Sequence, residues 1–272
     1  MIMKRTKKGE LHLHTTHSDG WITADDIKRC ALDFIAVTDH DTVDGFKELK
    51  ARLNGSIELI PGIELSTRYA GKSIHVLAYF FDYNNPELLR ELEYYRKKRV
   101  ERARKNFELL RGLGYAVDES RLNRNGTLAK PTIAMSVLEL PENNELLVRN
   151  MIDDVDDFID AYLVKGKPAY VGVEKISLDR IRELCKGPLV LAHPGVDLKR
   201  GKDDWIIKDL KEKYNFKGVE AFTRRHNGEE RDYYHKLAKN LDLVPTFGSD
   251  AHHYHRIGLY AADYELVEKL RA

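Results

Sequence analysis

The sequence has few cysteines, no long apolar run and almost no net charge. Its 272 residues include two cysteines, Cys30 and Cys185, whose wide separation fits neither a metal-binding spacing nor a disulfide framework. The 45 Lys and Arg residues balance 44 Asp and Glu residues, which excludes a strongly basic nucleic-acid coat protein and an acidic disordered tail. No stretch approaches the roughly 18 apolar residues of a membrane span, and the charged segment Met1–Gly9 has no apolar signal core behind it. We therefore expect a cytoplasmic protein with no membrane partner and no obligate protein partner.

Several common catalytic motifs are also missing. The chain has no Gly-x-Gly-x-x-Gly and no phosphate-loop motif, so nothing supports nucleotide binding by a glycine-rich cradle. It has no Gly-x-Ser-x-Gly elbow either. Ser249 beside Asp250 and His252 makes a poor catalytic triad, because a metal-binding role explains the last two residues better.

The apolar pattern predicts an α/β fold. Short apolar runs alternate with helix-like segments in the first eighty residues and again after residue 165, which is typical of parallel βαβ units. About seven strands are expected, close to the number that closes a barrel. The expected strands are Glu10–His14, Phe34–Thr38, Ile57–Leu65, Ile74–Phe80, Leu189–Ala192, Val219–Thr223 and Leu243–Phe247.

The middle of the chain differs from both ends. Helical spacing over Pro86–Arg111, Thr132–Leu140 and Leu146–Leu163 predicts a small helical domain at 83–165, inserted into a barrel of residues 1–82 and 166–272. The first of these helices is basic, whereas Glu139–Asp160 is strongly acidic. We interpret the two charge runs as neutralising one another in water, in preference to a binding face for a polyanion.

Histidines and acids occur at or near the ends of the expected strands. His12 and His14 are two residues apart on one strand, so their side chains leave the same face. In a parallel barrel the strand ends converge on one mouth, where active sites are built. Imidazoles and carboxylates without thiolates favour Mn, Fe or Zn ions over Mg, and so many ligands imply two or three ions. The expected ligands are His12, His14, Asp19, His40, Glu64, His75, His193, Asp250 and His252.

Other polar residues fall near the same mouth. His226 follows the strand Val219–Thr223, and its position fits an outer contact with substrate as well as a helix start. Arg224 and Arg225 beside it could grip a phosphate group, although loop arginines usually face water. His17, His253 and His255 lie in turns, where we expect solvated side chains rather than ligands.

These residues occur in motifs that resemble the polymerase and histidinol phosphatase (PHP) superfamily. The resemblance runs from residue 10 to about residue 258 and is strongest to stand-alone 3′,5′-bisphosphate nucleotidases and a related 5′→3′ exoribonuclease. The matching motifs are Leu11-His12-Leu13-His14, Ser18-Asp19-Gly20, Thr38-Asp39-His40-Asp41, Gly62-Ile63-Glu64, Ile74-His75-Val76, Ala192-His193-Pro194 and Gly248-Ser249-Asp250-Ala251-His252.

The resemblance implies a distorted (β/α)₇ TIM-like barrel with a trinuclear metal centre. It implies that His12, His14, Glu64 and Asp250 hold one ion, that Glu64 bridges to a second ion held with His75 and His193, and that Asp19, His40 and His252 hold a third. Relatives often have Arg-Pro-His where this chain has Lys130-Pro131-Thr132, so Lys130 would contact substrate with a charge but without a bidentate fork. His226 matches a histidine with a role toward substrate or leaving group, such as an acid.

The functional hypothesis is hydrolysis of a nucleotide phosphomonoester. The substrate would be a 3′,5′-bisphosphate or AMP-like nucleotide, and the other form of the hypothesis is an exonuclease that trims short single-stranded RNA. In both forms a hydroxide that bridges the ions attacks the phosphorus. Two alternatives stay open. One is a histidinol-phosphate-type small-molecule phosphatase, and the other is a non-catalytic metal-binding module akin to that of bacterial replicative polymerases, which a complete ligand set disfavours.

Overall fold

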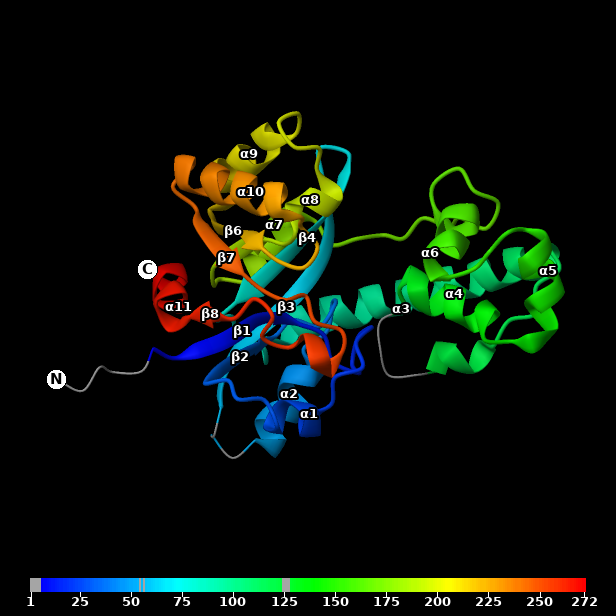
Figure 1. The fold of residues 1–272 in the computed structure, drawn as a ribbon, viewed down its shortest axis with the longest axis horizontal. Helices are drawn as coiled ribbons and strands as arrows, with labels where there is room; N and C mark the ends of the chain where they lie inside the picture. Colours follow the sequence, from blue (N-terminus) through cyan, green and yellow to red (C-terminus); the bar gives the residue numbers. More distant parts are fainter. Residues whose placement is uncertain (1–5, 54, 56, 124–127) are drawn as a thin grey trace. The chain divides into compact units, whose positions relative to one another are not determined.

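The chain folds into two compact units, seen in a computed structural model that describes residues 6–53, 55, 57–123 and 128–272. Met1–Glu91 and Lys175–Ala272 form a barrel unit, and Leu92–Glu174 form a helical unit. Figure 1 shows the strands gathered in the barrel unit.

One sheet organises the described part of the barrel unit. Its strand order is β7-β6-β5-β4-β3-β2-β1-β8. A bridge between Leu13 and Ala251 joins the end of β1 to the chain that follows β7, so the sheet nearly closes on itself. The α/β barrel prediction is confirmed, with an eighth strand of two residues that the apolar pattern did not indicate. The strands are β1 (Lys8–Leu13), β2 (Phe34–Val37), β3 (Glu58–Tyr69), β4 (Lys72–Tyr79), β5 (Leu189–Leu191), β6 (Phe216–Phe222), β7 (Val244–Phe247) and β8 (Ala262–Asp263).

The prediction of parallel units is wrong at β4. This strand runs antiparallel to both β3 and β5. Ala70 and Gly71 alone connect it to β3, both with left-handed backbone (φ 47° and 77°). Two residues make a tight hairpin but cannot make the crossover that parallel strands need. The long β3–β4 hairpin therefore stands inside an otherwise mostly parallel barrel.

Strand β2 has a buried side chain at every position, as its continuous apolar run predicts. Phe34 and Ala36 belong to the core cluster that also contains Leu77 and Val190 from the strands β4 and β5. Ile35 and Val37 belong to a second cluster that includes residues of α1 and α2. The two faces of the strand therefore pack into different layers.

Helices cover the outside of this sheet. The capping box of α1 explains its start, since the Thr23 side chain accepts from the Asp26 amide and the Asp26 carboxylate accepts from the Thr23 amide. Helix α10 packs on β6 and β7, and α11 packs on β7 and β8 (Figure 1). The helices of this unit are α1 (Ala24–Lys28), α2 (Asp44–Arg52), α7 (Leu178–Leu184), α8 (Pro194–Asp197), α9 (Asp204–Tyr214), α10 (Gly228–Asn240), the short η4 (Tyr254–Arg256) and α11 (Tyr264–Arg271).

The helical unit has its own apolar core, with Phe107 and Phe158 fully buried in it. The single helix expected over Leu146–Leu163 is wrong, because Met151 has left-handed backbone (φ 55°) and Asp154 caps a new helix.

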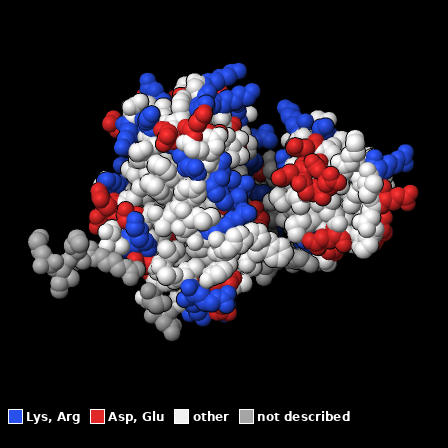
Figure 2. All heavy atoms as spheres, viewed as in Figure 1, with Lys and Arg blue, Asp and Glu red and all other residues white. Residues whose placement is uncertain are grey.

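Acidic side chains gather on the face of the helical unit shown in Figure 2. No described helix is both long and apolar enough to cross a membrane. The helices are α3 (Pro86–Gly112, which begins in the barrel unit), η1 (Glu119–Asn123), α4 (Lys130–Leu138), η2 (Pro141–Asn143), α5 (Asn144–Arg149), α6 (Val155–Phe158) and η3 (Ile159–Leu163).

Candidate metal centre

The structure brings all nine expected ligands together at one end of the barrel. His12 lies on β1, Glu64 on β3 and His75 on β4. The other members lie in the segments that follow β1, β2, β5 and β7. Their side chains form four overlapping groups in which imidazole and carboxylate atoms lie within 4.8 Å of one another. These groups are His14, Asp19, His40 and His252; His12, His14 and Asp250; His12, Glu64 and His193; and His40, Glu64 and His75.

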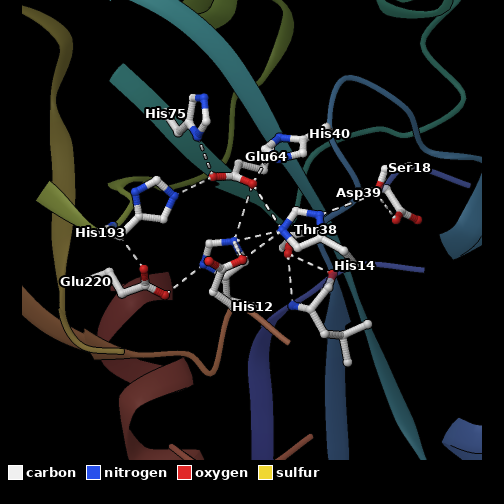
Figure 3. A network of polar contacts seen from close by, with 12 residues as sticks. His12, His14, Ser18, Thr38, Asp39, His40, Glu64, His75, His193 and Glu220 are labelled. Atoms are coloured by element: carbon white, nitrogen blue, oxygen red, sulfur yellow. Dashed lines mark hydrogen bonds and ion pairs between the residues drawn. The ribbon is translucent and has the colours of Figure 1, made fainter. Parts of the chain in front are cut away.

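Glu64 is the central residue, as Figure 3 shows, and it has no exposed surface. Its Oε1 atom faces Nδ1 of His75 at 3.1 Å and Nε2 of His193 at 3.0 Å. Its Oε2 atom faces Nε2 of His14 and Nδ1 of His40, each at 3.1 Å. The two oxygens of one carboxylate are therefore directed at two different sets of imidazoles, which is the arrangement of a bridging ligand.

Asp19 gathers a second set of histidines. Its carboxylate lies 3.4 Å from Nε2 of His252, 3.6 Å from Nδ1 of His14 and 3.7 Å from Nε2 of His40. His14 and His40 also face Glu64, so the sets around the two carboxylates share members. The result is one continuous cluster rather than separate sites.

Asp250 connects this cluster to two arginines. Its Oδ1 atom lies 3.2 Å from Nε2 of His14, and its Oδ2 atom pairs with Nε of Arg225. The Nε atom of Arg224 donates to the main-chain oxygen of Asp250 at 2.9 Å. The arginines that the sequence singled out as substrate contacts are thus fixed to a member of the cluster, and the side chain of Arg225 remains 40% exposed.

Two members of the cluster have unusual backbone. His193 (φ 22°) and Asp250 (φ 46°) both lie in the left-handed region. For non-glycine residues such conformations are unfavourable and persist where the surrounding structure enforces them, often at functional sites. They turn the chain sharply after β5 and β7, so that these side chains meet His12, His14 and Glu64.

The carboxylates and imidazoles shift one another's pKa values. Burial raises the pKa of Glu64, but the charges of His40 and of two further histidines outweigh it and hold the pKa well below its usual range. Burial opposes the charging of His14, yet polar contacts with Asp250 and Glu64 raise its pKa to about 10. His40 behaves in the opposite way, because burial dominates and lowers its pKa to about 4. The cluster therefore keeps its carboxylates charged although its imidazoles cannot all carry protons.

Divalent cations fit this donor set. The Oε2 atom of Glu64 and the Oδ1 atom of Asp19 are buried and accept no hydrogen bond of good geometry within the described residues, although ring nitrogens surround both atoms. Neutral imidazole nitrogens that point their lone pairs at a carboxylate would repel it, whereas a shared cation would attract both. Nitrogen and oxygen donors without thiolates suit first-row transition metals.

Curated proteins are similar to this chain over most of its length. The chain is 28% identical to a 5′-3′ exoribonuclease of Haemophilus influenzae, covering 91% of this chain and 90% of that protein. It is 29% identical to a 3′,5′-nucleoside bisphosphate phosphatase of Chromobacterium violaceum, covering 89% and 86% of the two chains. No family model matches the chain.

Solved structures share the fold. One is described as an amidohydrolase from Chromobacterium violaceum with bound sulfate and no metal, and it superposes with a TM-score of 0.79 at 25% identity over 96% of each chain. Another, a candidate metal-dependent phosphoesterase from Bifidobacterium adolescentis, gives a TM-score of 0.75 at 23% identity over 96% of this chain and 94% of that one. The chain is thus similar in sequence to these enzymes over most of its length, and both solved structures share its fold.

Within this barrel, two buried glutamates that the sequence analysis did not single out support the cluster. Glu220 on β6 accepts from Nδ1 of His12 at 2.8 Å and from the main-chain amide of His193 at 2.9 Å. Glu10 on β1 accepts from the amides of Ser249 and Gly258 at 2.8 and 2.9 Å. Each is the one acidic residue of its strand and is buried there, and an acid among the apolar positions was the available signal.

Asp197 is a third residue that the sequence analysis missed. It is the last residue of α8, and its Oδ2 atom is buried without a hydrogen-bond partner in the described structure. This atom lies 3.9 Å from Nδ1 of His193, and Asp197, His193 and His75 form a further group that could hold an ion. Its signal was weak, because an aspartate in a Pro-Gly-Val-Asp turn is unremarkable in a sequence.

His226 has a structural environment that differs from that expected of a proton donor. Its Nε2 atom accepts from the amide of Gly195 at 2.9 Å, and its Nδ1 atom donates to the main-chain oxygen of Ala221 at 3.0 Å. The ring is buried and stacks on Tyr234. Both nitrogens are thus engaged by the protein, and His226 anchors the turn that carries His193.

Four other residues named from the sequence lie outside the cluster, and these are Lys130, His17, His253 and His255. Lys130 is the first residue of α4 in the helical unit, and burial, followed by the charge of Arg102, lowers its pKa. Its contact with substrate stays a prediction. His17 pairs with Glu48 at 2.7 Å. His253 and His255 are exposed, as expected.

Proposed function

We propose that this protein is a metal-dependent phosphoesterase that removes phosphate from a 3′,5′-bisphosphate nucleotide or trims short single-stranded RNA. The observation that carries the proposal is Glu64, fully buried, with each carboxylate oxygen directed at a different set of imidazoles. A side chain placed in this way can hold two ions side by side, which is what phosphoryl transfer between oxygens exploits. The homologous enzymes act on nucleotides and RNA, and this supports the substrate class.

Two or three Mn, Fe or Zn ions would be held by His12, His14, Glu64 and Asp250, by Glu64, His75 and His193, and by Asp19, His40 and His252. When bound, these ions would supply an activated water and would stabilise charge that develops on the phosphoryl oxygens. Two of the groups in the structure support this assignment, namely His12, His14 and Asp250, and Asp19, His40 and His252 with His14 beside them. Glu64 groups with His193 and His12 and, separately, with His75 and His40.

Three neighbouring residues, Glu220, Arg225 and His226, would orient the ligands or contact the substrate. Glu220 fixes the ring of His12 through Nδ1, so that Nε2 is presented to the centre. Arg225 reaches the centre through Asp250 while part of its side chain stays in contact with solvent, where a phosphate can meet it. His226 keeps the His193 turn in place.

The test is release of phosphate from adenosine 3′,5′-bisphosphate by protein reconstituted with Mn²⁺, with the remaining mononucleotide identified. Release that leaves 5′-AMP supports a 3′-phosphatase, and a short 5′-phosphorylated RNA is the next substrate. The Glu64→Gln variant is the matched inactive control. Failure to release phosphate from the bisphosphate and mononucleotides from the RNA, with bound Mn²⁺ verified by elemental analysis, would remove the nucleotide assignment.

A further inference from the structure

A row of exposed aromatic rings borders the metal centre. The indole of Trp21 is 57% exposed, and its ring centroid lies 6.4 Å from that of His253 with planes only 7° apart. The ring of His255 follows at 5.8 Å from His253 with planes 17° apart. The rings of Trp21, His253 and His255, called the aromatic row below, are thus nearly parallel and open to solvent.

The aromatic row is built on segments that carry expected ligands. Trp21 comes two residues after Asp19, and its main-chain amide donates to the oxygen of His252 at 2.7 Å. His253 comes directly after His252, whose Nε2 atom faces the Asp19 carboxylate at 3.4 Å. A molecule lying on the row would therefore be adjacent to the Asp19–His252 edge of the centre.

Packing within the protein does not account for these exposed rings. Buried aromatic side chains stabilise a core through the area that they remove from water, but Trp21 and the two histidines leave much of their surface in solvent. Single exposed apolar residues are ordinary on protein surfaces. Parallel rings in a row beside a polar centre instead offer π-faces on which a planar ligand can stack.

Positive charges lie beside the same rings. Arg256 ends the short helix η4 that follows His253, and its main-chain amide donates to the His253 oxygen at 3.0 Å, whereas Arg224 follows β6. Arg224 is in turn bonded to the main-chain oxygen of Asp250. Guanidinium groups next to stacking surfaces are the combination that single-stranded nucleic acids recognise, because the cations meet phosphates while the rings meet bases.

We propose that the aromatic row is a nucleobase subsite, which holds the base next to the phosphate that is hydrolysed. The proposal rests on the proposed function and narrows it, since it makes an unpaired base a determinant of affinity. A base is planar and stacks on either face, so the row accepts purines and pyrimidines with limited preference. A paired terminus cannot use the row, because its base is already stacked within a duplex.

The kinetic test compares two substrates that differ only in one base. One is a short 5′-phosphorylated RNA, and the other is the same RNA with an abasic terminal residue. We expect Trp21→Ala to raise KM for the normal RNA roughly 10- to 100-fold with little change in kcat, and to leave KM for the abasic RNA unchanged. Trp21→Phe should restore most of the affinity. Equal KM values for Trp21→Ala and the unaltered protein on the normal RNA would overturn the proposal.

Trp205 provides a matched control. It lies on α9, is 53% exposed and is the second of the two tryptophans in the chain. Trp205→Ala should leave both KM values unchanged. If Trp205→Ala raised KM for the normal RNA as much as Trp21→Ala does, the effect would come from general loss of surface aromatics and the subsite would be rejected.

Binding without turnover separates the subsite from the proposed function. In a Trp205→Phe background, Trp21 is the sole source of tryptophan fluorescence. We expect 5′-AMP to quench this fluorescence and inorganic phosphate at equal concentration to leave it unchanged. Quenching by 5′-AMP in a protein that releases no phosphate would reject the proposed function and keep the subsite, whereas phosphate release without selective quenching would keep the function and reject the subsite.

Discussion

Each histidine of the centre has two ring nitrogens, and the structure shows how the protein directs one of them. In His12 the Nδ1 atom is bonded to Glu220, which leaves Nε2 to face Glu64 at 3.4 Å. In His252 the Nδ1 atom lies 3.0 Å from the main-chain oxygen of Asp250, which leaves Nε2 to face Asp19. Partners on the far nitrogen fix both the tautomer and the ring orientation of a ligand.

Loss of the Glu220 charge should therefore weaken metal binding without removing any ligand. For Glu220→Gln we expect the affinity for Mn²⁺ to fall roughly 10- to 100-fold, measured by competition with a chelator of known affinity. The control is Glu229→Gln, whose side chain is 83% exposed on α10. Unchanged affinity in Glu220→Gln would show that His12 does not need this partner.

Replacement of Glu64 should have a larger effect. The Glu64→Gln side chain keeps the shape but loses the charge that faces two sets of imidazoles. We expect phosphate release to fall by orders of magnitude and the number of bound ions per chain to decrease, measured by elemental analysis. The control Glu58→Gln, on the same strand, should keep both the normal rate of phosphate release and the normal number of bound ions. A Glu64→Gln protein with normal rate and metal content would contradict the assignment of the centre.

Sequence reasoning reached the nine clustered residues because each stands in a recognisable motif at or near a strand end. It did not reach Glu220 or Glu10, since their roles depend on long-range contacts, and it did not reach Asp197, whose turn gives little signal in the sequence. Glu10 and Ser249, for example, are bonded across 239 residues of sequence. A single acid in an apolar strand reads equally well as an edge residue until its partners are known.

At the scale of elements, turns and strand ends determine where the side chains of the expected ligands lie. The antiparallel β4 places His75 opposite Ser66, so that a residue from the first half of β4 lies at the same end of the barrel as the last residues of β1. Sequence reasoning found the strand but not its direction, because the apolar pattern of a buried strand is the same in both directions. The local signal for the direction of β4 is the connection at Ala70 and Gly71, because two residues can join only antiparallel strands.

The close approach of Gly248 to β1 and β6 gives a prediction at this scale. A methyl group at this position would lie 2.5 Å from both Glu220 Oε1 and His12 Cβ. We expect Gly248→Ala to lower metal content although no ligand is altered, because the added atom displaces His12 and its partner. The measurement is elemental analysis alongside circular dichroism. Gly228→Ala, which has nothing within 4 Å, should retain its metal.

The capping box of α1 gives a second prediction. Thr23→Ala removes the side chain that accepts from the Asp26 amide, and we expect a loss of about 1 kcal/mol in the free energy of unfolding. Thr23→Ser keeps a hydroxyl, so its free energy of unfolding should fall much less. Urea denaturation of both variants checks this, and equal stability of the two would show that the hydroxyl does not stabilise the helix start.

At the scale of the whole molecule, metal binding and folding should be coupled. Ions that bind only the folded barrel stabilise it by an amount that grows with their free concentration, about 2.7 kcal/mol at one hundred times Kd. We expect chelation to abolish phosphate release and lower Tm, and added Mn²⁺ to restore both in a concentration-dependent way. Tm measured by scanning calorimetry should respond much less in Glu64→Gln. An unchanged Tm in the unaltered protein after complete metal removal would contradict this coupling.

The division into units was harder to define from sequence than the fold class. Compositional change and helical spacing placed the insertion at 83–165, and this assignment of domains stays a prediction. In the structure α3 starts in the barrel unit and continues into the helical unit. A helix that crosses a boundary has the same spacing on both sides, so periodicity alone cannot mark the point where its partners change.

The bridge between Leu13 and Ala251 has a consequence for biosynthesis. During translation β1 leaves the ribosome first, but the chain that completes the mouth is made only after more than two hundred further residues. The nascent protein therefore holds an incomplete set of ligands for most of its synthesis, and transition metals available in that period have only weak sites to occupy. Tight metal uptake should thus wait until Asp250 and His252 have been made, so a premature stop codon before Asp250 would yield a protein that competes poorly for scarce ions in the cell.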